Sequence, residues 1–366
     1  MADNSTESPL VSIIVPVFNG AQFLRESLDS IVAQTYPRLE ITVMDDASTD
    51  STPDIIASYG DRVQCHRQPQ NRGIYANMND GIALARGEYI AIYHADDVYD
   101  PSIVEREVAF LQRHPEAGAV FCKDIFIDST GRELGQLELP PEVRGGRPLD
   151  YRIIFNALLT HKNRILRCPS CMVATAVYHD VGTYRQQEFF NTSDVEMYLR
   201  IARQYPVGIL EEHLFRYRRG HGNSGQRYRH LRTDQERFFK IMDLYLKQGG
   251  RAVATPEALS AYEAHRAEDG LMRVVSHYIL GHGQEAGAVL RQVRPHRLLA
   301  SARIQRGRLL VLYLALQFLT RLPRISFLAD LFYRRWHDKG DGKESVVPSP
   351  GAGDAVPPSS RKGFQP

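Results

Sequence analysis

Cysteine is scarce in this chain of 366 residues, which contains four: Cys65, Cys122, Cys168 and Cys171. So few cysteines in a chain of this length do not form the dense disulfide framework that stabilises small secreted domains. Cys168 and Cys171 make a single CxxC pair, and a zinc site would need two further ligands. We therefore expect ordinary reduced thiols and rank a metal or redox role well below that.

The chain also lacks a strong net charge, a leader sequence and a segment long enough to span a membrane. Its 45 lysines and arginines against 43 acidic residues give a net charge of +2, so the overall charge does not favour a nucleic-acid partner. No basic stretch followed by an apolar run opens the sequence, and we expect a cytoplasmic protein. The longest apolar run, Leu309–Leu319, falls short of the about 20 residues that a spanning helix needs.

Arginines lie on both sides of this apolar run, within residues 303–336. Two interpretations of the segment stay open. The segment either lies as an interfacial helix on an anionic surface, at the inner face of the cytoplasmic membrane, or packs on the rest of the protein with its arginines in water. We favour the membrane interpretation slightly. The flanking residues are Arg303, Arg306, Arg308, Arg321 and Arg324.

Apolar segments alternate with amphipathic segments of helical spacing in the first third of the chain. Val11–Phe18, Leu39–Met44 and the segment ending at His94 are predicted to be buried strands. Strands separated by helices of 10 to 15 residues are typical of parallel βαβ units. A further strand is expected at 119–126, a loop at 130–150, and helices from 232 to 300.

Polar and acidic residues follow each of the three convincing strands. Asn19 follows the first, Asp46 the second, and His94–Asp97 the third. Ligands of open α/β sheets bind beyond the carboxyl ends of the strands. The adjacent carboxylates of Asp96 and Asp97 fit a hard cation, Mg²⁺ or Mn²⁺, that bridges a diphosphate. The alternative is that one of them caps a helix starting near Pro101.

The order and spacing of five short motifs resemble the inverting family 2 glycosyltransferases of the GT-A fold, over residues 9–225. The resemblance implies the transfer of one sugar from a nucleotide-diphospho-sugar, UDP-linked by preference, to a hydroxyl of a glycan or lipid-linked acceptor. Assembly of bacterial cell-surface polysaccharide or glycoconjugate would use such a reaction. The motifs are Val15–Gly20, Val43–Thr52, Asn71–Gly73 with Asn79 and Gly81, Gly87–Ile90, and Ala95–Asp97.

The resemblance carries nucleotide-binding roles to five positions. Pro16, Phe18 and Asn19 would line the nucleotide. Asp46 would accept a hydrogen bond from the imide N–H of uracil, and Arg72 would lie near the base or the phosphates.

The last motif, Ala95–Asp97, departs from the family pattern at the residue that precedes it, His94. Asp96 would bind the metal that bridges the diphosphate, and Asp97 would support the loop or the waters of the metal. His94 stands where many relatives have an aspartate that contacts the ribose or the metal's waters. An imidazole can bind a hydroxyl or a metal, and an ordinary residue at the end of a strand is the alternative.

A second group of candidates lies between residues 190 and 225. The resemblance makes Asp194 the base that deprotonates the acceptor, with Ser193 in place of the family's glutamate. Glu196 is the backup candidate, although its spacing favours an ion pair with Arg200.

A glycine-rich basic loop follows this group. Arg218 and Arg219 are suited to phosphate oxygens, and His221 to the metal. The alternative is a solvated basic loop. Its glycines indicate a segment that can close over the donor.

These patterns together predict an α/β fold: a GT-A (Rossmann-like) domain at residues 10–230 with a mixed, mostly parallel sheet. A helical region at 231–337 follows, with a flexible start at 1–9 and a disordered tail at 338–366. The alternative function is a non-catalytic sugar-nucleotide or glycan-binding module on a degenerate transferase fold. A nucleotidyltransferase and a dinucleotide-dependent oxidoreductase are disfavoured, because the glycine-rich loops that they use are missing.

Overall fold

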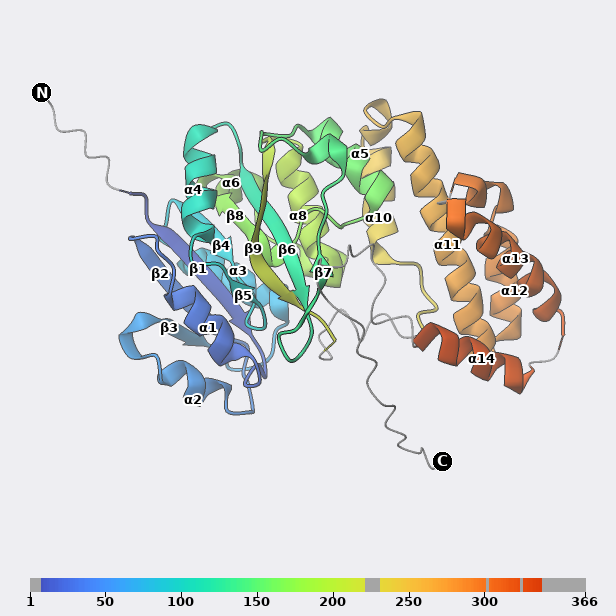
Figure 1. Ribbon diagram of the computed structural model, residues 1–366, viewed down its shortest axis with the longest axis horizontal. Coiled ribbons are helices and arrows are strands. Elements are labelled where there is room, and N and C mark those ends of the chain that lie inside the picture. Colours follow the sequence, from blue (N-terminus) through green and yellow to red (C-terminus); the bar gives the residue numbers. More distant parts are fainter. Residues whose placement is uncertain (1–7, 221–230, 301–302, 323–324, 338–366) are drawn as a thin grey trace, which may run out of the picture.

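The computed structural model describes residues 8–220, 231–300, 303–322 and 325–337. A single sheet of nine strands, flanked by helices, occupies one end of the molecule, and helices alone form the other end (Figure 1). The strand order is β3-β2-β1-β4-β8-β6-β9-β5, and β7 pairs with β6. The strands are β1 (Val11–Val17), β2 (Leu39–Asp45), β3 (Gln64–Arg67), β4 (Tyr89–Ile92), β5 (Val98–Tyr99), β6 (Ala119–Ile127), β7 (Glu133–Gln136), β8 (Cys171–Ala174) and β9 (Val207–Arg218).

The first half of the sheet is parallel, as the sequence predicts. Strands β1, β2, β3 and β4 all run in one direction, with Val11 beside both Leu39 and Tyr89. Every residue of β1 is buried, which is the pattern of a strand covered on both faces. The connecting helices are α1 (Leu24–Val32), α2 (Thr52–Ala57) and α3 (Ile74–Leu84).

The second half of the sheet is mixed. Strand β8 runs antiparallel between β4 and β6, and β6 runs parallel to β9. The predicted mixed sheet is thus confirmed. The predicted loop at 130–150 contains strand β7 and a short 3₁₀ turn at Pro141–Val143. The glycines and prolines of this segment are typical of loops, so its sequence did not predict these two short elements.

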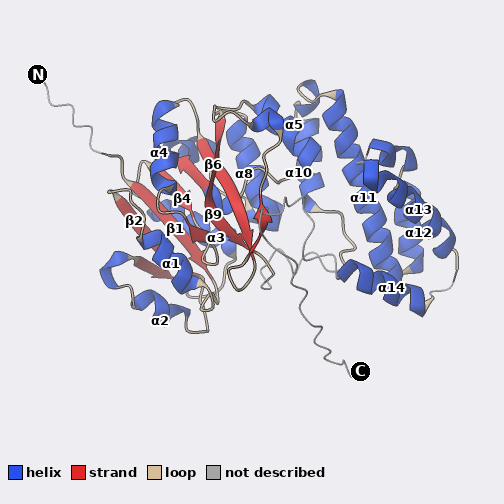
Figure 2. Ribbon diagram, viewed as in Figure 1, coloured by secondary structure: helices blue, strands red, loops and turns tan. Residues whose placement is uncertain are grey.

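Helices cover both faces of the sheet and continue into the second region (Figure 2). One core packs α1 and α4 on one face, and the other packs α3, α5, α8 and α10 on the opposite face. The remaining helices are α4 (Ile103–Arg113), α5 (Tyr151–His161), α6 (Thr175–Val181), α7 (Gln186–Phe189), α8 (Ser193–Ala202), α10 (Arg237–Lys247), α11 (Pro256–Ile279), α12 (Gly283–Gln292), α13 (Arg303–Leu319) and α14 (Ser326–His337).

Helix α11 joins the two regions. Its first half, including Tyr262, belongs to the core beside the sheet, whereas Leu271 and the later residues pack with α12 and α13. The helix begins where the side chain of Thr255 caps the N–H of Ala258 at 3.2 Å and Pro256 occupies the first turn. Within the part of the chain that the structure describes, no helix combines the length and apolarity needed to cross a bilayer.

Candidate active site

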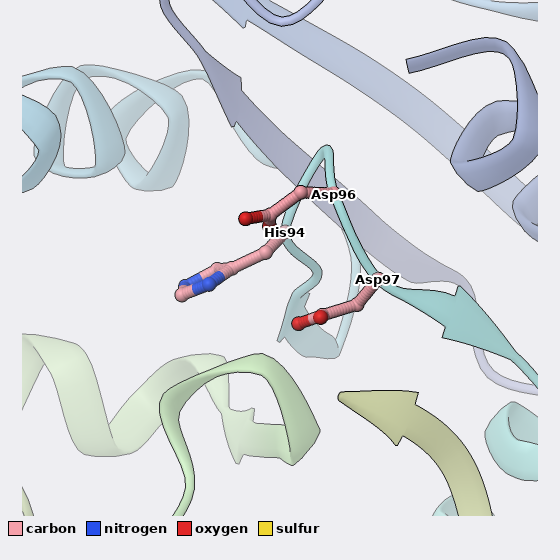
Figure 3. Close-up of side chains that lie close together, drawn as sticks. All are labelled: His94, Asp96 and Asp97. Atoms are coloured by element: carbon pink, nitrogen blue, oxygen red, sulfur yellow. The ribbon is translucent and has the colours of Figure 1, made fainter. Parts of the chain in front are cut away.

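The loop after β4 brings together Asp96 and Asp97, two of the predicted metal ligands, and His94. His94, Asp96 and Asp97 each offer one ligand atom, and these atoms lie within 4.8 Å of one another. Figure 3 shows the three side chains leaving this loop. A hydrogen bond within the same segment holds this loop in place, since the N–H of His94 donates to the hydroxyl of Tyr99 at 2.6 Å. The ring of Tyr99 stacks on Tyr93 with 4.1 Å between centroids.

The electrostatics of this loop favour a bound cation. Burial and the neighbouring charge of Asp96 raise the pKa of Asp97 well above its usual value, although the N–H of Arg218 donates to Asp97. Burial lowers the pKa of His94, which favours the neutral imidazole that binds metals. Within the described chain, Asp97 Oδ2 and His94 Nε2 are buried and have no hydrogen-bond partner. Because an unpaired buried polar atom is costly, the donor set fits a divalent cation held by two carboxylates and one nitrogen.

Arg218, an expected phosphate ligand, lies beneath this loop. It is the last residue of β9 and is 1% exposed. Its guanidinium donates to the carbonyl of Asp96 at 2.9 Å, to the carbonyl of Asp128 at 3.1 Å and to Glu26 at 2.6 Å. Each guanidinium nitrogen therefore has a protein partner that fixes Arg218 against the metal loop, and its predicted contact with phosphate stays a prediction.

Of the other two candidates in the basic loop, Arg219 and His221, the structure describes only Arg219. The guanidinium carbon of Arg219 lies 3.5 Å from the ring centroid of Phe126, at the end of β6. His221 falls outside the described residues, and its predicted metal contact stays a prediction.

Asp46 organises the loop before α3. Its two carboxylate oxygens accept the backbone N–H groups of Arg72 and Gly73, each at 2.8 Å. Gly73 has a φ of 88°, a conformation that favours glycine. The side chain of Arg72 pairs with Asp80 rather than pointing into open space. A carboxylate oxygen has a second lone pair, so the predicted contact between Asp46 and the base stays a prediction.

The end of β1 is tied to the end of β2 by Asn19. This residue has a φ of 51°, and its N–H donates to the hydroxyl of Ser48 at 2.9 Å. Its side-chain oxygen accepts from the N–H of Thr49 at 2.8 Å. Pro16 is buried within the strand, whereas the ring of Phe18 is 48% exposed at the sheet edge. Of the three, Phe18 presents the open surface on which a base can stack.

Asp194 is the second residue of α8 and has a well-defined environment. The hydroxyl of Tyr75 donates to Asp194 Oδ1 at 3.1 Å. Burial raises the pKa of Asp194, while hydrogen bonds from the N–H of Val195 and from Tyr75, and the charge of Arg167, act in the opposite direction. A carboxyl group with a raised pKa is suited to accept a proton near neutral pH.

The positions beside Asp194 have structural partners. Ser193, which replaces the glutamate of the family, is fully buried, and its hydroxyl donates to the carbonyl of Phe190 at 2.7 Å. Glu196 forms an ion pair with Arg200 at 2.9 Å and is 2% exposed. The expected pairing of Glu196 is therefore confirmed, and Asp194 is the acid of this segment with the better placement for proton transfer.

The buried thiol of Cys168 lies within the electrostatic range of both Asp194 and the metal loop. Burial raises the pKa of Cys168 to about 12, and the charges of both Asp194 and Asp97 add to this shift. Sequence reasoning missed Cys168, Tyr75 and Arg167 as parts of this site, since Tyr75 and Asp194 are 119 positions apart and no motif joins them.

A separate polar cavity of about 560 Å³ lies between α3 and α7. Its walls are residues 70–72 of the loop before α3, residues of α3 itself and residues 184–188, so it shares Arg72 with the predicted nucleotide site. The side chain of Gln186 ties two of these walls together, because its amide donates to the carbonyl of Arg72 and accepts from the N–H of Ala76.

Comparison with known proteins agrees with this geometry. The model of the glycosyl transferase family 2 matches residues 12–179. An uncharacterized glycosyltransferase of Rickettsia typhi is 40% identical over 215 residues, which cover 58% of this chain and 65% of that protein. An uncharacterized protein of Mycobacterium tuberculosis is 30% identical over 281 residues, covering 74% of each chain. The chain belongs to glycosyl transferase family 2.

Solved structures show the same fold. S. aureus TarS in complex with UDP-GlcNAc superposes with a TM-score of 0.54 at 16% identity, covering 89% of this chain and 92% of that one. The mannosyltransferase PcManGT from Pyrobaculum calidifontis, in complex with GDP-Man and Mn²⁺, superposes with a TM-score of 0.51 at 20% sequence identity. The match covers 92% of this chain and 88% of that one. The fold is therefore GT-A. The matches to the five Rickettsia relatives span 28% to 65% of their own length.

Proposed function

We propose that this protein transfers one sugar from a nucleotide-diphospho-sugar, by preference a UDP-sugar, to an acceptor hydroxyl with inversion at the anomeric carbon. The observation that carries the proposal is the cluster of three ligand-type side chains, His94, Asp96 and Asp97, in the loop after β4. The carboxyl group of Asp194 lies in the same region, since its charge and that of Asp97 both raise the pKa of Cys168. The cluster suits a leaving diphosphate, and Asp194 suits an attacking hydroxyl.

His94, Asp96 and Asp97 are the residues that would hold the cation. A bound Mn²⁺ or Mg²⁺ would neutralise the diphosphate of the donor. A neighbour of the same fold with GDP-Man and Mn²⁺ supports this choice of ion class. Phe18 and Asn19 would bind the nucleoside, because they border the same sheet edge and the Phe18 ring is open.

The remaining steps depend on Asp194. Its carboxylate takes the proton from the acceptor hydroxyl while the hydroxyl oxygen bonds to the anomeric carbon from the face opposite the diphosphate. The bond between that carbon and the diphosphate oxygen breaks, and the nucleoside diphosphate leaves. The hydrogen bond from Tyr75 to Oδ1 would hold the carboxylate of Asp194 in position for this step.

The departures from the family pattern do not argue for a non-catalytic module. Ser193 takes a local hydrogen-bonding role with Phe190, while the neighbouring Asp194 retains a buried, tyrosine-bound carboxylate. His94 still belongs to a cluster of three ligand-type side chains. The acceptor is proposed to be a glycan or a lipid-linked glycan of the bacterial cell surface.

The proposal is tested by release of the nucleoside diphosphate from a panel of UDP-sugars, with water as the default acceptor, by wild type and Asp194→Asn. We expect slow metal-dependent release of UDP from at least one sugar, and a loss of at least about 100-fold in the variant. Asp180→Asn is the matched control, since Asp180 contacts Tyr205 at the surface. Tight nucleotide binding without turnover would instead support the non-catalytic module.

A further inference from the structure

Helix α13 is apolar on the side that faces away from the protein. Val311, Leu314 and Phe318 are 68%, 67% and 65% exposed. Their spacing of three and four residues places them on one side of the helix. On the opposite side, Leu316 is fully buried and Leu319 is 9% exposed. The helical region therefore uses one side of α13 for its own core and leaves a second apolar side open.

Helix α14 repeats this arrangement. Phe327 and Leu331, four residues apart, are 73% and 49% exposed. Ala329 is 1% exposed, and Phe332 packs edge-on against Tyr278 of α11. Both helices therefore pack on α11 with one side only. They lie at the end of the molecule remote from β3 and α2 (Figure 1), where the described chain supplies no further element to cover them.

The charges around these two apolar stripes are mostly positive. Residues 303–336 contain seven arginines and one acidic residue, Asp330, although the whole chain has 45 basic and 43 acidic residues. Arg308 precedes Val311 by three residues, and Arg321 follows Phe318 by three residues. Both arginines are exposed. Each therefore stands near one end of the stripe of α13 and close to its exposed side.

We infer that the exposed sides of α13 and α14, formed by residues 308–322 and 325–334, bind the surface of an anionic lipid bilayer. Exposed large apolar side chains enter the boundary between headgroups and acyl chains, and the arginines pair with lipid phosphates. The 17 residues of α13 rise about 26 Å, which is shorter than the about 30 Å of the hydrocarbon core. The helix therefore lies on the bilayer rather than across it.

The charge pattern favours a lipid surface over a second copy of the chain. A two-fold contact through these sides would place one set of arginines against another, with Asp330 as the nearby acidic partner. A bilayer containing phosphatidylglycerol offers both apolar depth and negative phosphates. This surface is independent of the proposed transferase chemistry, because none of its residues belongs to the candidate active site.

The test is co-sedimentation of the full chain with vesicles of phosphatidylcholine alone or with one third phosphatidylglycerol. We expect binding to the anionic vesicles, a decrease with added salt, and a loss of at least about tenfold in the triple variant Val311→Ser, Leu314→Ser, Phe318→Ser. Arg308→Gln should weaken binding about fivefold. Leu280→Ser, at a 43% exposed leucine in the same region, is the control and should bind like wild type.

Circular dichroism checks that the variants are folded, which we expect because the substituted side chains are exposed. Binding to both vesicle types with equal strength would overturn the anionic assignment. Absence of binding, with a wild-type dimer that the triple variant converts to a monomer in light scattering, would show that a second copy covers this face. Absence of binding by a monomeric wild type would overturn the inference altogether.

Discussion

Removal of the hydroxyl of Tyr75 should shift the pH dependence of transfer. The hydroxyl donates to Asp194 Oδ1 at 3.1 Å, a length near the upper end for such bonds. Hydrogen bonds to charged groups contribute about 1.5–3 kcal/mol, and the long distance points to the lower value. One pKa unit corresponds to about 1.4 kcal/mol, so Tyr75→Phe should raise the pKa of Asp194 by about one unit.

The direction of the shift follows from the role of Asp194. The base acts as a carboxylate, and the hydrogen bond stabilises the carboxylate, so its loss favours the protonated form. The acidic limb of kcat/KM should therefore move up by about one pH unit, and transfer below that limb should fall about tenfold. Well above the limb, wild type and variant should agree. Burial and Arg167 act on Asp194 in both proteins and do not change the comparison.

The assay is UDP release as a function of pH with a donor that wild type turns over. Tyr36→Phe is the matched control, because its hydroxyl donates to the carbonyl of Pro9 at 2.7 Å, away from the site. It should leave the profile unchanged. Superimposable profiles for Tyr75→Phe and wild type would refute the reasoning, since Tyr75 would then not act on the group that controls the acidic limb.

Three further predictions concern the metal loop and the nucleotide. His94→Asp should shift the ion preference from Mn²⁺ toward Mg²⁺, because it replaces a nitrogen ligand by an oxygen ligand. The measurement is the rise in melting temperature with UDP and each ion. If the two ions rank as they do for wild type, His94 is not a ligand of the metal. Arg218→Met should lower the free energy of unfolding, measured in urea, by about 3 kcal/mol, because it removes the buried partner of an ion pair. Arg216→Met is the control at an exposed pair with Glu133 and should lower it by less than about 1 kcal/mol. Equal effects would contradict a role of Arg218 in fixing the metal loop. Phe18→Ser should weaken UDP binding about two- to tenfold by calorimetry, and unaltered affinity would show that the base does not stack there.

The parts of the fold that the sequence predicted are those with local signals. Buried strands such as Val11–Val17 appear as continuous apolar runs, and the acids that follow them mark the carboxyl edge of the sheet. The antiparallel strand β8 at Cys171–Ala174 was not predicted, because no acidic motif follows it and the segment was read as a CxxC pair. Its place between β4 and β6 depends on contacts between distant segments.

In the candidate site, too, the sequence predicted groups of neighbouring residues but not contacts between distant ones. The cluster of His94, Asp96 and Asp97 was predictable, because its members are neighbours in sequence. Tyr75 was not, since its partner Asp194 lies on another helix. The phosphate contact predicted for Arg218 stays a prediction. The sequence did not predict the burial of Arg218 or its hydrogen bonds with the carbonyl of Asp96 and with Glu26, because these partners lie far from it in the chain.

The most direct test of the account is thermal unfolding of wild type and Asp96→Ala with UDP, with and without Mn²⁺. Ligand binding to the folded state raises the melting temperature by mass action. The account predicts a rise with UDP and Mn²⁺ together in wild type, and its loss in Asp96→Ala. An equal rise in both proteins, or one that does not depend on Mn²⁺, would contradict a metal-bridged diphosphate at this loop.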